Sequence, residues 1–165
     1  MSLERLWADW RSEYVTHPDT GRDDKSCVIC NLVDATDDAE ALVLERTRTT
    51  ITVMNLYPYG SGHLMVAPIR HAASYVDLTE AENDDVARAQ LRALRAIGAA
   101  YGPDGANVGA NLGRAAGAGV PGHLHVHVLP RWSGDTNFMT AVAETRVLPE
   151  SLRTGYDKLK ASWGR

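Results

Sequence analysis

The chain has 165 residues, of which 44% are hydrophobic and 23% charged, as expected for one globular domain with a substantial core. Its net charge of −4 gives no reason to expect binding to nucleic acid or an anionic membrane, although a local site for a small phosphorylated ligand stays possible. No apolar run is long enough to span a membrane and the N-terminus has no signal-peptide core, so we expect a cytoplasmic protein.

Hydrophobic periodicity predicts three helices. Residues 3–15 and residues 149–163 carry apolar side chains at helical spacing, near the two ends of the chain. Residues 80–101 form a longer amphipathic pattern, with Thr79 as a plausible N-cap and Gly102 followed by proline as the stop signal. We expect residues 1–165 to form a single domain whose core covers about residues 25–138.

Segments rich in β-branched and alternating apolar residues lie between these helices and predict a sheet. The expected strands are residues 41–47, 49–54, 63–67, 105–113, 123–129 and 139–145. Short turns join most of them, and one long helix is interposed. This order favours an α+β fold with a mainly antiparallel sheet.

Three histidines, His123, His125 and His127, alternate with apolar residues near the C-terminal third of the chain. Alternate side chains of a strand point to the same face, so the three imidazoles are expected to form a row, with apolar side chains on the other face. Such a row suits a metal or phosphoryl chemistry, because neutral imidazole is both a ligand and a nucleophile near neutral pH. An exposed strand face that carries histidine by chance is the alternative reading.

Cys27 and Cys30 are the only cysteines and form a Cys-x-x-Cys pair. Without a secretion signal, metal binding or redox chemistry is favoured over a structural disulfide. The pair supplies half of a zinc site, and buried free thiols are the alternative. Residues 114–122 contain three glycines, three alanines and one proline, so their backbone N–H groups can approach an anion.

The alternating histidines followed by Val-Leu-Pro-Arg resemble the signature of the histidine triad family. The resemblance extends back through Asn111-Leu112-Gly113 to residues 55–66, and thus covers most of residues 40–135. It implies a histidine triad fold, in which a long helix packs on a five-stranded sheet. It also implies a homodimer in which two sheets become continuous.

The resemblance further implies roles for particular residues. His125 would attack a phosphorus atom and carry the nucleotidyl group, His123 and His127 would flank it, and His63 would support the row. His127 and the loop near Gly119 would face the phosphate, and Asn55 and Asn111 would bind the nucleoside, although from spacing alone both asparagines read as turn residues. Resemblance to some bacterial members implies a structural zinc ion bound by Cys27, Cys30, His71 and His123. The catalytic reaction would need no metal.

Two departures from the common family pattern bear on the substrate. The polar residues that many relatives carry just before the triad are replaced here by Gly117-Ala118-Gly119-Val120-Pro121-Gly122, one residue longer, which leaves leaving-group preference open. Residues 130–138 together with residues 55–59 resemble an actinobacterial branch that acts on diadenosine tetraphosphate, some members being phosphorylases.

The expected function is therefore cleavage of dinucleoside polyphosphates through a nucleotidyl-histidine intermediate, resolved by water or inorganic phosphate. Nucleoside phosphoramidate hydrolysis uses the same intermediate and stays an alternative. A nucleotide-binding protein with little catalysis is a second alternative, and a metal sensor ranks last because no DNA-reading helix or other output module is visible.

Overall fold

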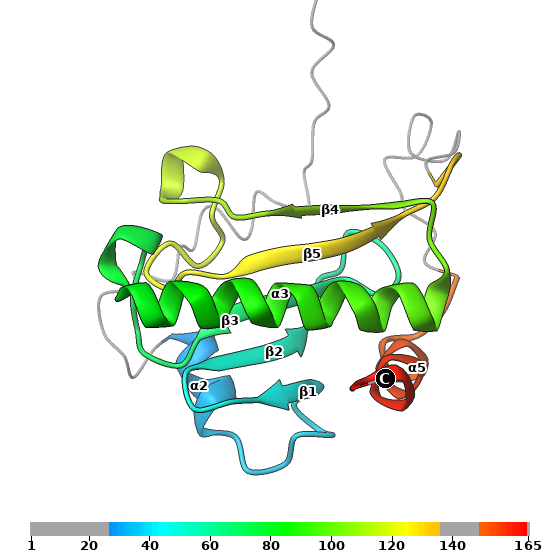
Figure 1. Ribbon diagram of the computed structural model, residues 1–165, viewed down its shortest axis with the longest axis horizontal. Helices are drawn as coiled ribbons and strands as arrows, with labels where there is room; N and C mark the ends of the chain where they lie inside the picture. Colours follow the sequence, from blue (N-terminus) through cyan, green and yellow to red (C-terminus); the bar gives the residue numbers. More distant parts are fainter. Residues whose placement is uncertain (1–26, 136–148, 165) are drawn as a thin grey trace, which may run out of the picture.

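The computed structural model describes residues 27–135 and 149–164 of the chain. The helix predicted at residues 3–15 and the strand predicted at residues 139–145 lie outside the described residues. The described part contains one sheet with helices on it (Figure 1). None of the helices in this part of the chain is long and apolar enough to cross a membrane.

The sheet has five strands in the order β1-β2-β3-β5-β4, and every neighbouring pair is antiparallel. The strands are β1 (Val43–Arg46), β2 (Thr50–Met54), β3 (Leu64–Pro68), β4 (Gly105–Gly109) and β5 (Val126–Arg131). β2 is buried along its whole length, as its β-branched run requires. This arrangement confirms the predicted α+β fold with a five-stranded antiparallel sheet.

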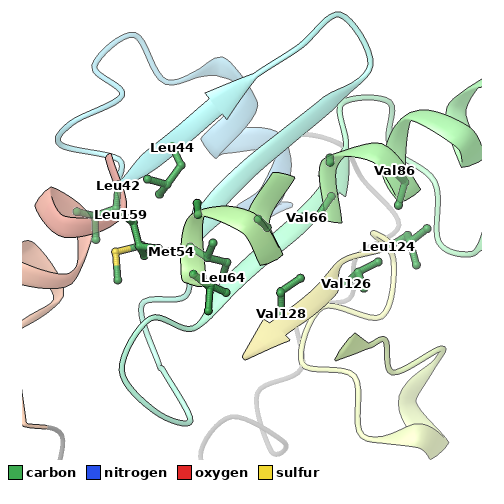
Figure 2. Packing of buried hydrophobic residues seen from close by; sticks show 14 of the residues in the cluster. Leu42, Leu44, Met54, Leu64, Val66, Val86, Leu124, Val126, Val128 and Leu159 are labelled. Atoms are coloured by element: carbon green, nitrogen blue, oxygen red, sulfur yellow. The ribbon is translucent and has the colours of Figure 1, made fainter. Parts of the chain in front are cut away.

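Helix α3 (Glu80–Tyr101) covers one face of the sheet (Figure 1). It begins at a capping box in which Thr79 and Glu82 satisfy each other's backbone N–H groups, and it ends at Gly102 in the left-handed conformation. Its buried side chains, Val86 among them, pack on apolar residues of β3 and β5 such as Val66 and Val126 (Figure 2). Both the predicted bounds of this helix and its predicted cap are confirmed.

Helix α2 (Val28–Asp34) was not predicted, and it packs on the other face of the sheet. Its Ile29 is buried in a cluster with apolar side chains of β1 and β2. The helix has only seven residues, and its N-cap Cys27 makes no side-chain capping hydrogen bond to the described residues. Both of the local signals by which a helix is recognised, length and cap, are therefore weak here.

The triad strand starts later than predicted. β5 begins at Val126, so only His127 of the three histidines lies in the strand. β3 pairs with β5 from Val126 onward, whereas the N–H of Leu124 donates to the carbonyl of Ala72 outside the sheet (2.6 Å). The alternation nevertheless persists, because Leu124, Val126 and Val128 all join the core beneath α3 (Figure 2).

Helix α5 (Leu152–Ser162) confirms the C-terminal helix predicted over residues 149–163, with slightly narrower bounds. It lies beside the C-terminal end of α3 and next to β1 (Figure 1). Leu159 packs with Leu42 and Met54 in the same core (Figure 2). Two short 3-10 turns, η2 (Tyr75–Asp77) and η3 (Arg114–Ala116), complete the described elements.

Candidate functional site

His63 and His127 form the most direct contact of the histidine cluster. His63 precedes β3, His127 lies in β5 opposite Met65, and the two strands are paired, so the rings meet across the sheet. Nε2 of His63 lies 2.9 Å from Nδ1 of His127. The backbone N–H of Tyr59 donates to the other nitrogen of His63 at 3.0 Å, and the Tyr59 ring lies against both imidazoles.

These contacts fix the proton positions of both neutral rings. Because Nδ1 of His63 accepts from a backbone N–H, the proton of neutral His63 is on Nε2, which donates to Nδ1 of His127. Neutral His127 must then carry its own proton on Nε2. His127 can therefore present an N–H donor to a ligand.

His125 has the opposite arrangement. Its Nδ1 lies 2.8 Å from the carbonyl oxygen of His123, and a carbonyl only accepts, so this nitrogen carries the proton. The lone pair of neutral His125 is consequently on Nε2, and the ring lies edge-on to His127 with centroids 5.1 Å apart. One lone pair and one N–H donor are thus presented by adjacent rings.

Burial favours the neutral form of His63 and of His125. His63 is fully buried, and desolvation together with the nearby His127 and His125 lowers its pKa from 6.5 to about 3. Desolvation also lowers the pKa of His125, which is 5% exposed, while its hydrogen bond to the His123 backbone opposes that shift. At neutral pH the His125 lone pair is therefore available for nucleophilic attack.

Four side chains gather into a group that could hold a metal ion: Cys27, Cys30, His71 and His123. They come from three parts of the chain, namely the start of α2, the turn after β3, and the segment before β5. Their candidate ligand atoms all lie within 4.8 Å of one another. This is the residue set that the sequence analysis expected.

The distances in this group fit a tetrahedral ion. Nδ1 of His123 lies 3.4 Å from Sγ of Cys27 and 3.5 Å from Sγ of Cys30, and Nδ1 of His71 lies 3.2 Å from Sγ of Cys30. Zinc bonds of about 2.3 Å to sulfur and about 2.0 Å to nitrogen place tetrahedral ligand atoms about 3.5 Å apart. The other nitrogen of His123 donates to the Pro68 carbonyl (2.8 Å), which turns Nδ1 toward the sulfur atoms.

His123 joins the two groups of side chains. Its ring belongs to the cluster with the cysteines, and its carbonyl oxygen accepts a hydrogen bond from His125 Nδ1–H. The position of His123 therefore sets which nitrogen of His125 has the lone pair. The link is local, because the carbonyl that accepts from His125 belongs to the residue two positions earlier in the chain.

Arg46 is a supporting residue that the sequence analysis missed. Its guanidinium donates to the carbonyls of Leu32, Val33 and Ala35 at the C-terminal end of α2, at 2.7–3.1 Å, and also pairs with Asp38 at 2.6 Å. It thereby anchors to β1 the helix whose first turn carries both cysteines. A single arginine in a strand gives no sequence signal of this role.

The expected nucleotide-binding residues lie in loops beside the histidines. Asn55 is 9% exposed, accepts from the N–H of Tyr57 (3.0 Å), and its Nδ2 lies 3.4 Å from Nδ1 of His63. Asn111 donates to the Gly117 carbonyl (3.4 Å), within the glycine-rich loop that also contains Gly119. Both asparagines thus shape their loops, and their contact with a nucleotide stays a prediction.

The chain is similar to known proteins over most of its length. The HIT domain family model matches residues 35–134 of the chain. An AP-4-A phosphorylase of Mycobacterium tuberculosis is 39% identical over 99% of this chain and 86% of its own length. An adenosine 5'-monophosphoramidase of Schizosaccharomyces pombe is 27% identical over 78% of this chain and 91% of its own length.

A solved structure also matches the fold. The crystal structure of a zinc-bound histidine triad family protein from Mycobacterium smegmatis superposes with a TM-score of 0.69 at 26% identity. The match covers 85% of this chain and 94% of that one.

Proposed function

The chain belongs to the histidine triad family, and on that premise we propose that it is an enzyme that cleaves dinucleoside polyphosphates through a nucleotidyl group carried on His125. One observation carries the proposal: a lone pair on His125 Nε2 is presented next to an N–H donor on His127. Attack and charge stabilisation at one phosphorus atom require this pair of groups.

The first step forms a bond between His125 Nε2 and the α-phosphorus and breaks the bond from that phosphorus to the bridging oxygen. The leaving nucleoside polyphosphate takes the electron pair, and His127 Nε2–H donates to an oxygen of the reacting phosphate. The proton on Nδ1 of His125 stays on that nitrogen, hydrogen-bonded to the His123 carbonyl, so Nε2 keeps its lone pair until attack. His63 holds His127 in the donor orientation.

The second step releases the nucleotide. Water or inorganic phosphate attacks the same phosphorus, the P–N bond breaks, and the electron pair returns to His125 Nε2. We propose phosphate as the preferred acceptor, because the 39% identical mycobacterial relative bears the name AP-4-A phosphorylase. Backbone N–H groups near Gly119 and the side chains of Asn55 and Asn111 are proposed to hold the phosphate and nucleoside of the substrate.

The Cys2His2 group is proposed to hold structural zinc. Two thiolates and two imidazoles form a closed tetrahedral set, which leaves no ligand position for substrate. The ion would neutralise the thiolates and would connect α2 to the turn after β3 and to the segment before β5. Within this arrangement His123 is oriented by Pro68, and the His123 carbonyl in turn orients His125.

Replacement of Arg46 by methionine should weaken zinc binding about tenfold, because the carbonyls at the end of α2 lose their donor and the cysteine-bearing helix loosens. Competition with a chromogenic chelator measures the zinc affinity. Arg92→Met is the matched control, since Arg92 pairs with Glu45 of β1 and is also partly buried. Equal zinc affinity in Arg46→Met and the wild type would show that Arg46 does not support the metal group.

We also propose a homodimer formed through β4. This strand lies at the end of the sheet, pairs with β5 on one side, and is exposed at all five residues. Such an edge is a template for pairing with another strand, and two copies in antiparallel register would make the sheets continuous. Val108, which is 44% exposed, would become buried in this interface.

The products formed from diadenosine tetraphosphate test the proposed function. ATP and ADP, seen only when inorganic phosphate is present, are the expected products. ATP and AMP as products, both with and without inorganic phosphate, would show that water is the acceptor. No cleavage in either buffer, together with release of an amine from an adenosine phosphoramidate, would favour the activity for which the Schizosaccharomyces pombe relative is named.

A further inference from the structure

The C-terminal helix α5 lies beyond residues 35–134, which the family model matches, and yet it is joined to the loop that supports His63. The connection begins at Glu150, just before the helix. Both oxygens of this carboxylate are engaged: the hydroxyl of Tyr101 donates to one at 2.6 Å and Nζ of Lys158 to the other at 2.6 Å. The Glu150 side chain is only 11% exposed, although its partner Lys158 is 49% exposed, so the hydrogen bond from Tyr101 is the more buried of the two.

Tyr101 is held as a neutral donor by this arrangement. Burial, and then the hydrogen bond to Glu150, raise the pKa of its hydroxyl above the usual value of 10. Lys158 lies 5.5 Å from the centroid of the same ring, which adds a cation–π contact. The last residue of α3 is thus fixed by α5 on one side.

The Tyr101 ring also packs on Gly62, the residue before His63. A Cβ added to Gly62 would lie 2.7 Å from Cε2 of Tyr101, and the φ of Gly62 is +71°. The position therefore requires glycine both for its backbone conformation and for the closeness of the ring. Four residues of the same loop line a small pocket together with Glu150, Ser151 and Leu152, namely Pro58, Gly60, Ser61 and Gly62.

This loop also supplies the backbone N–H of Tyr59, which fixes the proton position of His63. A continuous series of contacts therefore runs from Lys158 through Glu150 and Tyr101 to the loop, and from the loop to His63 and His127. At the helix, Gly155 permits the approach of α5, because a Cβ there would lie 3.1 Å from both Met54 and the Tyr101 hydroxyl.

We propose that Glu150 and Tyr101 are positioning residues that hold the loop over residues 58–62 against His63, so that α5 governs the orientation of the His63–His127 pair. The proposal rests on the proposed function of that pair. It gives the C-terminal helix a role in turnover in addition to its role in core packing.

The test uses the full-length chain with Glu150→Met, Tyr101→Phe and the double variant, because methionine has a similar length to glutamate but no oxygen to accept from Tyr101. Each single variant should lower kcat about tenfold with KM changed by less than about twofold, because the substrate contacts remain while the donor on His127 is misplaced. The double variant should be no slower than Glu150→Met alone, since both changes remove the same hydrogen bond. Asp157→Asn is the matched control, because Asp157 forms an exposed ion pair with Arg153 on the same helix.

Imidazole ¹⁵N spectra provide a readout that does not depend on turnover. Wild-type His63 should give one tautomer with its proton on Nε2, and Glu150→Met and Tyr101→Phe should give a mixture of tautomers. Unchanged spectra with unchanged kcat in both variants would overturn the proposal, and so would an equal loss in Asp157→Asn. If the wild type cleaves no dinucleotide, the proposed function fails, and the His63 spectra alone decide whether Glu150 and Tyr101 position the loop.

Discussion

Replacing His125 with asparagine is expected to lower turnover of diadenosine tetraphosphate by about four orders of magnitude or more, the scale seen when a covalent nucleophile is removed. The Nδ2 of asparagine can occupy the position of His125 Nδ1 and keep the hydrogen bond to the His123 carbonyl. What is lost is Nε2, the nitrogen with the lone pair. Steady-state kinetics with excess inorganic phosphate measures the effect.

The fold and the metal group should survive this change. His125 is only 5% exposed, and asparagine preserves its hydrogen bond to the His123 carbonyl, so zinc content and circular dichroism should match the wild type. His125→Ala should be as inactive, but less stable because it leaves a cavity. Turnover above about a tenth of the wild-type rate in either variant would mean that another group is the nucleophile.

Loss of the metal is expected to have the largest effect on stability. Replacing Cys30 with serine, or treating the wild type with a strong chelator, should remove zinc, lower Tm by about 10 °C or more, and abolish turnover. Cys30 lies within 3.5 Å of the Nδ1 atoms of both His71 and His123, so its sulfur is the contact shared by the group. Without the ion, the three segments that meet there lose their common anchor.

Scanning fluorimetry and metal analysis measure this effect together. Added zinc should restore Tm and turnover to the chelated wild type and should restore neither in Cys30→Ser. Chelator should not lower the Tm of Cys30→Ser any further. The variant therefore controls for effects of the chelator that do not depend on this metal group. A chelated wild type that keeps its Tm and turnover would contradict a structural role for the metal.

The elements with strong local signals were predicted well from the sequence. The 22-residue helix α3 repeats its apolar pattern over six turns and begins at Thr79, whose capping box is formed within four residues. Helix α2 was missed, because the groups that satisfy its last carbonyls come from Arg46, 11–14 residues farther along the chain. Its stabilisation is tertiary, so local propensity does not reveal it.

The start of β5 was placed too early for a similar reason. The alternation of apolar residues from Leu124 onward is real, but strand pairing depends on the neighbour, and β3 pairs from Val126. The N–H of Leu124 instead donates to Ala72, a contact across 52 positions that no local pattern contains. Periodicity therefore identified the buried face without locating the end of the strand.

The grouping of residues in the candidate site could be predicted from the sequence only through the family resemblance. His63 and His127 are separated by 64 residues and Cys30 and His71 by 41, so spacing alone could not bring them together. The proton positions came from the structure, since they depend on the Tyr59 N–H and the His123 carbonyl. The link from Glu150 to Tyr101 spans 49 residues, and Glu150 lies outside the region of resemblance.

The central claim is that His125 carries the nucleotidyl group, and a trapped intermediate tests it most directly. The enzyme is mixed with diadenosine tetraphosphate without phosphate, quenched in alkali because phosphoramidates are labile in acid, and digested for peptide mass spectrometry. The account predicts one adenylyl group on His125 in the wild type and none on the corresponding peptide of His125→Asn. An adenylyl group on another residue, or one that persists in His125→Asn, would contradict it.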